Sequence, residues 1–302
     1  MSDFRRELTL VRQGLTPDSW DAIAAKIAAD RHEREANLRD SPPVGGWRYL
    51  KKQLDEHSWA ALPIKFEQVE AVRKHLMLHP VQLGSHFDNR GPLMRLEDVR
   101  GPFACYRPDQ FMRAPSLLDQ VNDPRLLDLI EAYLGCTPTL YSLNAWWSLP
   151  SPKPEYVNVQ YFHRDTDDFR FLVLFIYLTD VDGESGPHQI VPGSHDPRRV
   201  PKETFVDSMG VEFSEHIEKT YSPDTIAGPA GTMFLANTVA LHRGLVPKKK
   251  ARLILWARYG LGPNTNSVDN VQGPYAQSQL LNRLKDTPRN RYVNRLIIDF
   301  DR

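Results

Sequence analysis

The chain has 302 residues, of which 41% are hydrophobic and 25% charged, an ordinary composition for a globular protein. Its 38 Lys and Arg residues balance its 38 Asp and Glu residues, so the net charge gives no reason to expect nucleic acid or an anionic membrane as a partner. The longest apolar run, residues 171–178, is too short to cross a bilayer, which takes about 20 residues.

Two features predict a cytoplasmic location. The first residues contain no apolar stretch of signal-peptide length. Cys105 and Cys136 are far apart and lie in no paired metal-binding spacing, which predicts two reduced thiols in the core.

Residues 1–137 are predicted to be mostly helix and connecting loop. Thr16 is a suitable N-cap, Pro17 suits the first helical position, and the apolar residues that follow have helical spacing. A second helix is predicted over residues 66–76, ending before Pro80.

The clearest helix is predicted directly before the chain changes character. Asp123 is its N-cap, Pro124 is its first residue, and Gly135 ends it. One apolar face is formed by Leu126, Leu127, Ile130 and Leu134. We therefore expect this helix to pack on the core.

From about residue 138 the sequence consists of short segments with high β propensity, separated by Pro, Gly, Asp and Asn. These segments are predicted to be strands at 139–147, 156–162, 170–178, 188–192, 231–236 and 252–259. Helices first and strands later predict a β core with helices packed outside it, rather than alternating βαβ units.

The most informative segment is residues 160–195, in which His163 and Asp165 lie two residues apart at the end of a predicted strand. Side chains at i and i+2 point to the same face of a strand. One imidazole and one carboxylate side by side are two of the three donors of a 2-His-1-carboxylate site, which leaves positions open for Fe(II) chemistry. Alone the pair is weak evidence, because His-x-Asp also occurs by chance.

A third donor and an arginine come from a distant segment. His242 follows an apolar strand, and Arg252 begins the next predicted strand ten residues further on. A jelly roll brings such distant strands together at one mouth of the barrel. A guanidinium group there could grip the distal carboxylate of 2-oxoglutarate through two parallel hydrogen bonds.

These elements, with GESGPHQIVPGSH at 183–195 between them, resemble the phytanoyl-CoA dioxygenase family of Fe(II)/2-oxoglutarate-dependent oxygenases. The resemblance covers about residues 60–260. It implies a mainly β fold with flanking helices and a double-stranded β-helix core, that is, a jelly roll of the cupin-like kind.

The resemblance also implies one oxygenase domain over residues 1–302. Its parts are a mostly helical segment at 1–137, the jelly-roll core at 138–260, and a tail or outer helix at 261–302. An outer helix is favoured within 274–286, where apolar residues have helical spacing.

Position by position, the resemblance implies Fe(II) as cofactor, with 2-oxoglutarate and O₂ as cosubstrates. The family's iron ligands match His163, Asp165 and His242. Arg252 matches the residue that binds the 2-oxoglutarate carboxylate. Phe175 lies on the strand where the family presses an aromatic ring against the cosubstrate, and Asn144 lies on the preceding strand, where it could donate to the cosubstrate or the substrate.

Two departures from the family pattern concern the arginine. The spacing of ten residues between His242 and Arg252 is one shorter than expected, which predicts a trimmed loop. The second position after the distal histidine is often a hydroxyl residue, whereas here it is Gly244. This glycine puts one cosubstrate hydrogen bond in doubt, but not the metal site.

The implied activity is oxidative decarboxylation of 2-oxoglutarate to succinate and CO₂, coupled to oxidation of a C–H bond in a small-molecule substrate. Related halogenases replace the carboxylate ligand by a small residue. Because Asp165 is retained, hydroxylation is favoured, or a related desaturation, epimerisation or ring formation.

Other polar residues near the motif have simpler interpretations. His188 and His195 flank the turn at 191–194, where a structural role is favoured for both, although His188 could point inward. Arg258 lies on the same strand face as Arg252 by its even spacing and could reach the pocket. Asp167 and Asp168 are expected to shape the metal loop.

Two other functions stay open on the sequence. One is a redox-inactive, metal-dependent jelly-roll isomerase or epimerase, which would need no 2-oxo acid clamp, so Arg252 argues against it. The other is a non-catalytic binding protein, which would have no reason to keep the site intact. The sequence does not indicate the substrate, the oligomeric state, or whether residues 1–60 form a lid or an oligomer contact.

Overall fold

Strands from both halves of the chain build the core. The computed structural model describes residues 3–35, 38, 47–84, 91–150, 158–200, 204, 210–262, 274–280 and 284–302. The strands are β1 (Trp59–Ala61), β2 (Val81–Leu83), β3 (Leu93–Met94), β4 (Phe103–Cys105), β5 (Thr139–Ser148), β6 (Phe171–Tyr177), β7 (His188–Ile190), β8 (Asp224–Ile226), β9 (Met233–Ala236), β10 (His242–Gly244), β11 (Arg252–Gly260), β12 (Tyr275–Ala276) and β13 (Ile298–Asp299).

Helices surround these strands. They are α1 (Asp3–Gly14), α2 (Pro17–Glu35), α3 (Arg48–His57), α4 (Val69–Met77), α5 (Pro108–Phe111), α6 (Leu117–Val121), α7 (Pro124–Leu134), α8 (Val211–Thr220) and α9 (Pro288–Asn294). Three short 3₁₀ turns complete the described elements, at Leu96–Asp98, Asn158–Gln160 and Gln277–Gln279. None of the helices in the described part of the chain is long and apolar enough to cross a membrane.

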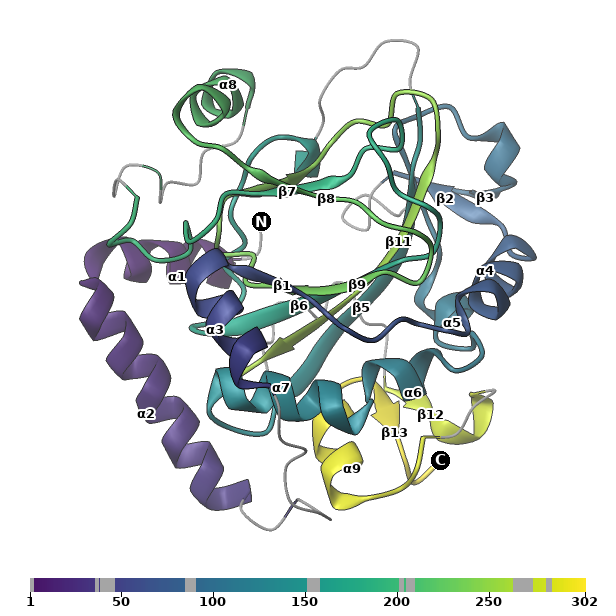
Figure 1. Ribbon diagram of the computed structural model, residues 1–302. Helices are drawn as coiled ribbons and strands as arrows, with labels where there is room; N and C mark the ends of the chain where they lie inside the picture. Colours follow the sequence, from purple (N-terminus) through teal and green to yellow (C-terminus); the bar gives the residue numbers. More distant parts are fainter. Residues whose placement is uncertain are drawn as a thin grey trace.

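Two antiparallel sheets face each other (Figure 1). The larger sheet has eight strands in the order β1-β9-β6-β11-β5-β4-β2-β3, and the smaller has the order β10-β7-β8. Isolated bridges at His163–His242 and Val181–Gly228 supplement the ladders. The described strands thus form an open sandwich, not a closed barrel, and the space between the sheets is lined by the inner face of the larger one.

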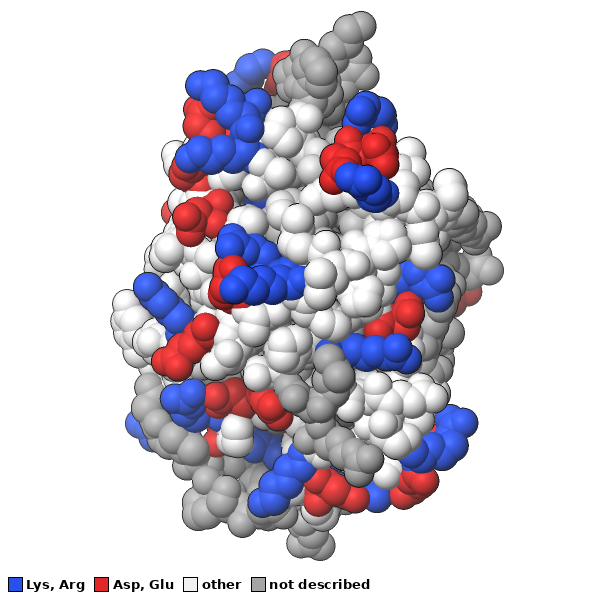
Figure 2. All heavy atoms as spheres, turned by 90° about the vertical axis from the view of Figure 1, so that its right-hand side faces the viewer, with Lys and Arg blue, Asp and Glu red and all other residues white. Residues whose placement is uncertain are grey.

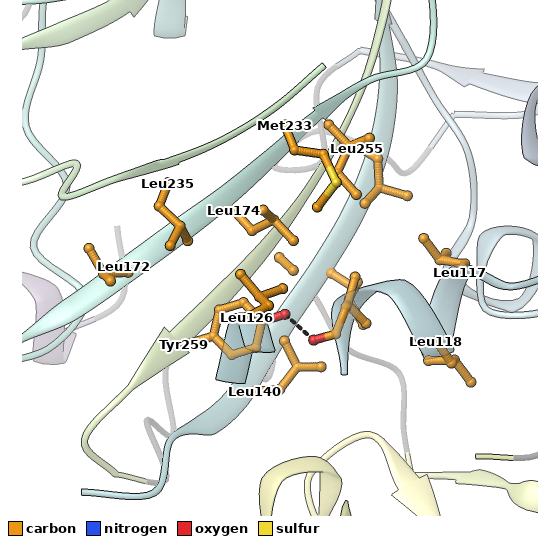
Figure 3. Packing of buried hydrophobic residues seen from close by; sticks show 14 of the residues in the cluster. Leu117, Leu118, Leu126, Leu140, Leu172, Leu174, Met233, Leu235, Leu255 and Tyr259 are labelled. Atoms are coloured by element: carbon orange, nitrogen blue, oxygen red, sulfur yellow. Dashed lines mark hydrogen bonds between the residues drawn. The ribbon is translucent and has the colours of Figure 1, made fainter. Parts of the chain in front are cut away.

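The outer face of the larger sheet packs against helices (Figure 3). Leucines from β6 and β11 meet Leu117 and Leu118 of α6 and Leu126 of α7. Tyr259 of β11 lies in the same cluster, and its hydroxyl donates to the carbonyl of Val121 at 2.5 Å. Because this face is sealed by helices, the other face of the same strands is the one available for a site.

The three helices predicted from the sequence are confirmed, and only α4 has ends that differ from the predicted ones. α2 begins at Pro17, and the Thr16 hydroxyl accepts a hydrogen bond from the backbone N–H of Ser19 at 3.1 Å. α7 is capped by Asp123 and ends at Gly135, whose φ of 89° favours glycine. The helix predicted over 66–76 is α4, which starts and ends later.

The first part of the chain contributes more strand than predicted. β1 to β4 all lie before residue 138 and all join the larger sheet. They have only two or three residues each, too few to show an alternating pattern in the sequence. Their strand conformation comes from partners elsewhere in the chain, since β1 pairs with β9 and β4 with β5.

Two predicted elements are wrong. In place of a strand over 156–162, residues 158–160 form a 3₁₀ turn and pairing begins only at His163, while 156 and 157 lie outside the described residues. The backbone N–H of Phe162 donates a hydrogen bond to the hydroxyl of Ser214 in α8, at 3.0 Å, and not to a neighbouring strand.

The second error is the helix expected within 274–286. Its described residues form β12 and a 3₁₀ turn, and 281–283 lie outside the described residues. β12 pairs in parallel with β13 near the end of the chain, a partner that local spacing does not reveal. The apolar pattern was correct about burial, because Leu280 and Leu284 are both buried.

Charged side chains on the surface are mixed in sign. On the face drawn in Figure 2, Lys and Arg alternate with Asp and Glu. This distribution follows the balance of charges in the sequence. Both cysteines, by contrast, are buried, as predicted.

Candidate metal centre

The backbone places His163, Asp165 and His242 together. His163 and His242 form an isolated antiparallel bridge, with N–H to O=C distances of 3.0 and 3.1 Å. The N–H of Asp165 donates to the carbonyl of Thr238 at 2.8 Å. Two segments about eighty residues apart are thereby fixed against each other, and their side chains project into one place.

The three side chains have metal-site spacing. His163 Nε2 lies 4.0 Å and His242 Nε2 lies 3.8 Å from oxygens of Asp165, and the two rings have centroids 4.2 Å apart. One ligand atom from each residue lies within 4.8 Å of the others, the only such group of His, Cys, Asp and Glu found in the described part of the chain. Such a set of two imidazoles and one carboxylate suits Fe(II).

Hydrogen bonds orient both imidazoles for metal binding. His163 Nδ1 lies 2.8 Å from the carbonyl of Tyr161, and His242 Nδ1 lies 2.9 Å from the carbonyl of Ala240. A carbonyl only accepts, so each Nδ1 carries the proton and each Nε2 presents a lone pair. Burial lowers the pKa of His163, and burial and then the charge of His163 lower the pKa of His242 to about 3, which keeps both rings neutral near pH 7.

The carboxylate ligand is held by a buried charge network. Arg258 donates to Asp165 at 3.1 Å and also to Asp167, which accepts a further hydrogen bond from the Tyr141 hydroxyl at 3.1 Å. Burial lowers the pKa of Arg258, but Asp165 and Asp167 outweigh it and raise the pKa above its usual value. The sequence indicated that Arg258 faces inward. The structure shows that it contacts the candidate ligand Asp165.

Asp168 shapes the loop, as the sequence predicts. It accepts hydrogen bonds from the backbone N–H groups of Phe169, Leu261 and Gly262. Burial nevertheless raises the pKa of Asp168 to about 6. The metal loop is thus tied to the end of β11.

Arg252 lies on the inner face of the larger sheet and is buried, with 3% of its surface exposed. Its guanidinium donates to the carbonyl of Gly186 and to the Ser148 hydroxyl at 3.2 Å, while Nε has no hydrogen-bond partner among the described residues. Burial lowers the pKa of Arg252 and Tyr177 offsets only part of this effect. No carboxylate of the described residues compensates its charge.

Gly244 makes room for this arginine. A Cβ atom at residue 244 would lie 2.6 Å from Nη2 of Arg252, closer than real contacts allow. The hydroxyl group that the sequence lacks at this position is provided near the arginine by Ser148 instead, which is the register partner of Arg252 across β5 and β11. Ser148 gave no motif signal, because only the pairing of two distant strands brings it here.

Phe175 and Asn144 also lie on the inner face. Phe175 stacks on Phe234 with ring centroids 5.0 Å apart. Asn144 is buried, pairs in register with Trp256, and accepts a hydrogen bond from the N–H of Ala145 at 2.9 Å. Both positions are compatible with the cosubstrate-binding roles predicted for them, which stay predictions.

The two histidines beside the 191–194 turn differ. The Nδ1 of His195 lies 2.7 Å from the Ser58 hydroxyl, a structural contact between the turn and the start of β1. His188 instead has its ring 4.5 Å from that of Phe175 and 6.3 Å from that of His242. Burial and then Arg252 lower the pKa of His188 well below its usual value.

A separate cavity of about 720 Å³ lies beside α1 and α2. Its walls include Arg12, Trp20, Tyr133, Phe169 and His195. None of the three candidate ligands, nor Arg252, lines it. Charged residues beside this cavity form ion pairs with each other, for example Arg198 with Asp18 and Asp21. The candidate metal centre therefore lies in the space between the sheets and not in this cavity.

Between two facing antiparallel sheets, the fold thus brings together a candidate metal centre with three donor side chains and a buried arginine. The chain belongs to the phytanoyl-CoA dioxygenase family, because the family model for Phytanoyl-CoA dioxygenase (PhyH) matches residues 49–245, more than half of the chain. The match includes His163, Asp165 and His242 and ends before Arg252. No curated protein sequence matches this chain.

Several solved structures are similar to this chain. The epimerase SnoN from nogalamycin biosynthesis, in complex with Fe³⁺, alpha ketoglutarate and nogalamycin RO, is 19% identical with a TM-score of 0.52, over 80% of this chain and 94% of that chain. Another SnoN structure is 20% identical with a TM-score of 0.50, over 71% and 82%. EctD from S. alaskensis with 2-oxoglutarate and 5-hydroxyectoine is 16% identical with a TM-score of 0.48, over 75% and 79%.

These comparisons confirm the predicted family and the jelly-roll fold with flanking helices. The SnoN complex holds Fe³⁺ and alpha ketoglutarate, and the donor set present in this chain suits Fe(II).

Proposed function

We propose that this protein is an Fe(II)- and 2-oxoglutarate-dependent oxygenase in which His163, Asp165 and His242 bind the iron. The observation that carries the proposal is the convergence of two oriented imidazoles and one carboxylate within 4.8 Å, on the same inner side of the sheets as a buried arginine. An iron ion held by these three donors would keep further coordination positions open for a cosubstrate.

Each ligand has a distinct task in this proposal. The two Nε2 atoms donate lone pairs, and the backbone carbonyls of Tyr161 and Ala240 hold the rings in the required tautomer. Asp165 supplies negative charge, and Arg258 orients its carboxylate. Partners of this kind are usually worth about 10- to 100-fold in metal affinity.

Arg252 is proposed to bind the distal carboxylate of 2-oxoglutarate. A buried guanidinium without a carboxylate partner is unfavourable by itself and is stabilised by an anionic ligand. Phe175 is proposed to pack against the carbon chain of the cosubstrate, and Asn144 to donate to the cosubstrate or to the substrate.

The reaction proposed is hydroxylation, or a related C–H oxidation, of a small-molecule substrate. When bound, iron and 2-oxoglutarate supply oxidative decarboxylation to succinate and CO₂, with O₂ as the oxidant. Asp165 favours hydroxylation over halogenation, because halogenases have a small residue where this chain keeps a carboxylate that would hold the iron. The proposed location is the cytoplasm.

One alternative deserves a separate test, because SnoN is described as an alpha ketoglutarate-dependent epimerase. Epimerisation is therefore compatible with the same cosubstrate and is distinguished from hydroxylation only by the substrate product. A redox-inactive isomerase or a binding protein would consume no 2-oxoglutarate. Arg252 supports the cosubstrate-dependent reading, because neither of these proteins has use for a 2-oxo acid clamp.

Cosubstrate turnover tests the proposal. Purified protein with Fe(II) and 2-oxoglutarate in air should release succinate, slowly without substrate and faster when a substrate is present. Asp165→Ala should abolish this release, and Glu215→Ala, which changes an exposed carboxylate paired with Lys219 on α8, should not. Iron-loaded protein that forms no succinate with any small molecule tested, and does not bind 2-oxoglutarate, would contradict it.

A further inference from the structure

His188 occupies the interior between the candidate metal ligands and Arg252. Its ring lies 4.5 Å from Phe175, 5.8 Å from Phe234 and 6.3 Å from His242, measured between centroids, and it is parallel to the His242 ring within 8°. The aromatic side chains hold the ring in one orientation, and the metal ligand lies beyond its face.

Strand register places the same residue beside Arg252. β7 pairs with β10 so that His188 is opposite Gly244. Gly244 is the residue whose Cβ would lie 2.6 Å from Nη2 of Arg252. Gly186, two residues before His188, accepts a hydrogen bond from the same guanidinium. The imidazole and the guanidinium therefore border one space.

Both groups leave a buried nitrogen unused. Nδ1 of His188 and Nε of Arg252 have no hydrogen-bond partner among the described residues. Most buried polar side-chain atoms in proteins do have a partner, and leaving a buried donor unsatisfied is unfavourable. Two such nitrogens around one space indicate an acceptor that fits between them.

A structural role does not account for the side chain. The backbone of His188 is already fixed by its pairing with β8 and β10, and its N–H donates to the Tyr177 hydroxyl at 3.3 Å. Nδ1 of His195, by comparison, forms a hydrogen bond with the Ser58 hydroxyl. Within the part of the chain that the structure describes, the imidazole of His188 has no corresponding contact at Nδ1.

We propose that His188 is a cosubstrate-positioning residue, whose Nδ1–H donates to a carboxylate oxygen of 2-oxoglutarate alongside Arg252. This inference rests on the proposed function of the site. The carboxylate accepts from both nitrogens, and the imidazole face packs on Phe175, so the dicarboxylic acid is held at its distal end in one orientation. Monocarboxylic 2-oxo acids would lose this contact.

Binding of 2-oxoglutarate to the Mn(II)-loaded protein, measured by calorimetry without turnover, tests the inference. His188→Leu keeps the volume but removes the donor, and should raise the dissociation constant about 10- to 100-fold, as expected for a hydrogen bond to a charged group. His188→Asn places an amide N–H near the position of Nδ1 and should restore most of the affinity. His216→Leu, a change at an exposed histidine on α8, is the matched control and should bind as the wild type does.

The outcomes separate this inference from the proposed function. If the wild type binds 2-oxoglutarate and His188→Leu binds it equally well, the role of His188 is overturned and the proposed function stands. Equal weakening in His188→Leu and His188→Asn would indicate packing and overturn the hydrogen bond. A weaker Mn(II) affinity in His188→Leu would show an effect on the metal ligands and overturn it too. If the wild type binds Mn(II) but not 2-oxoglutarate, both proposals fail.

Discussion

Two buried arginines on one strand, Arg252 and Arg258, have opposite surroundings. Arg258 donates to two carboxylates, Asp165 and Asp167, and its pKa is raised. Arg252 lies six residues earlier on the same inner face. Among the residues that the structure describes, it donates only to a carbonyl and the Ser148 hydroxyl, and its pKa is lowered. Both are at least nine-tenths buried, so the difference lies in charge compensation and not in exposure.

This difference indicates that Arg258 holds protein carboxylates in place, whereas Arg252 is suited to bind an anionic ligand. A buried cation that is already paired stabilises the groups around it and has little capacity for a ligand. A buried cation with only neutral partners has unused electrostatic capacity, which an anion can use. At the metal end, two carboxylates share the one guanidinium of Arg258 and leave a net negative charge, which suits a cation. At the other end, Arg252 leaves a positive charge, which suits a carboxylate.

The largest expected effect is on stability. Arg258→Met leaves Asp165 and Asp167 buried without their cation and should lower the free energy of unfolding by about 3–5 kcal/mol. Arg252→Met removes a cation that pairs with no carboxylate in the described ranges, and should change the free energy of unfolding by less than about 1 kcal/mol. Urea denaturation of the metal-free variants measures both. An equal loss of unfolding free energy in the two variants would contradict the difference in charge compensation between Arg258 and Arg252.

Acid should weaken the metal-free protein through the buried histidines. The pKa values of His242 and His195 are lowered to about 3 and about 4, so below pH 6.5 the unfolded chain binds protons that the folded chain does not. Between pH 6.5 and 5, each of these histidines should lower the free energy of unfolding by about 2 kcal/mol.

Asp168 opposes this loss, which provides an internal control. Its pKa is raised to about 6, so its protonation between pH 6 and 4 favours the folded state. Asp168→Asn should therefore make the loss on acidification steeper. Urea denaturation at several pH values measures it, and a stability that is constant or rises from pH 6.5 to 5 would contradict the account.

A smaller effect is expected from a conservative change at the recognising arginine. Arg252→Lys keeps the charge but loses the planar fork, and should raise the dissociation constant of 2-oxoglutarate about 10- to 100-fold while metal affinity stays the same. Calorimetry on Mn(II)-loaded protein measures both constants. If Arg252→Lys binds 2-oxoglutarate as tightly as the wild type does, the proposed pair of parallel hydrogen bonds from Arg252 is wrong.

The smallest effect concerns the glycine under the arginine. Gly244→Ala places a methyl group within 2.6 Å of Nη2 of Arg252 and should weaken 2-oxoglutarate binding a few-fold, about 1 kcal/mol, by displacing the guanidinium. Gly183→Ala is the matched control, because a Cβ there meets nothing within 4 Å. Identical affinities in the two variants would show that Arg252 can move without loss.

The sequence was sufficient to predict the three candidate ligands and Arg252 as one group. The order of these residues along the chain, and the family resemblance that this order carries, led to that prediction, even though the segment before His163 is a 3₁₀ turn and not the expected strand. The prediction survived this error because the backbone bridge to His242 fixes the side chains without a long ladder.

The parts that sequence reasoning missed depend on pairing between distant strands. Ser148 contacts Arg252 because β5 and β11 place them in register, and His188 faces the interior because β7 pairs with β10. Neither register is visible in local periodicity. The short strands β1 to β4 were missed for the same physical reason, since partners elsewhere in the chain determine their conformation.

The most direct test of the central claim is an anaerobic titration of the Fe(II)-loaded protein with 2-oxoglutarate, following the visible metal-to-ligand charge-transfer band. The account predicts a saturable band in the wild type and the same band in Arg252→Met only at about 100-fold higher 2-oxoglutarate. Asp165→Ala should show no band. Bound iron without a band in the wild type, or saturation of Arg252→Met at the wild-type concentration, would contradict it.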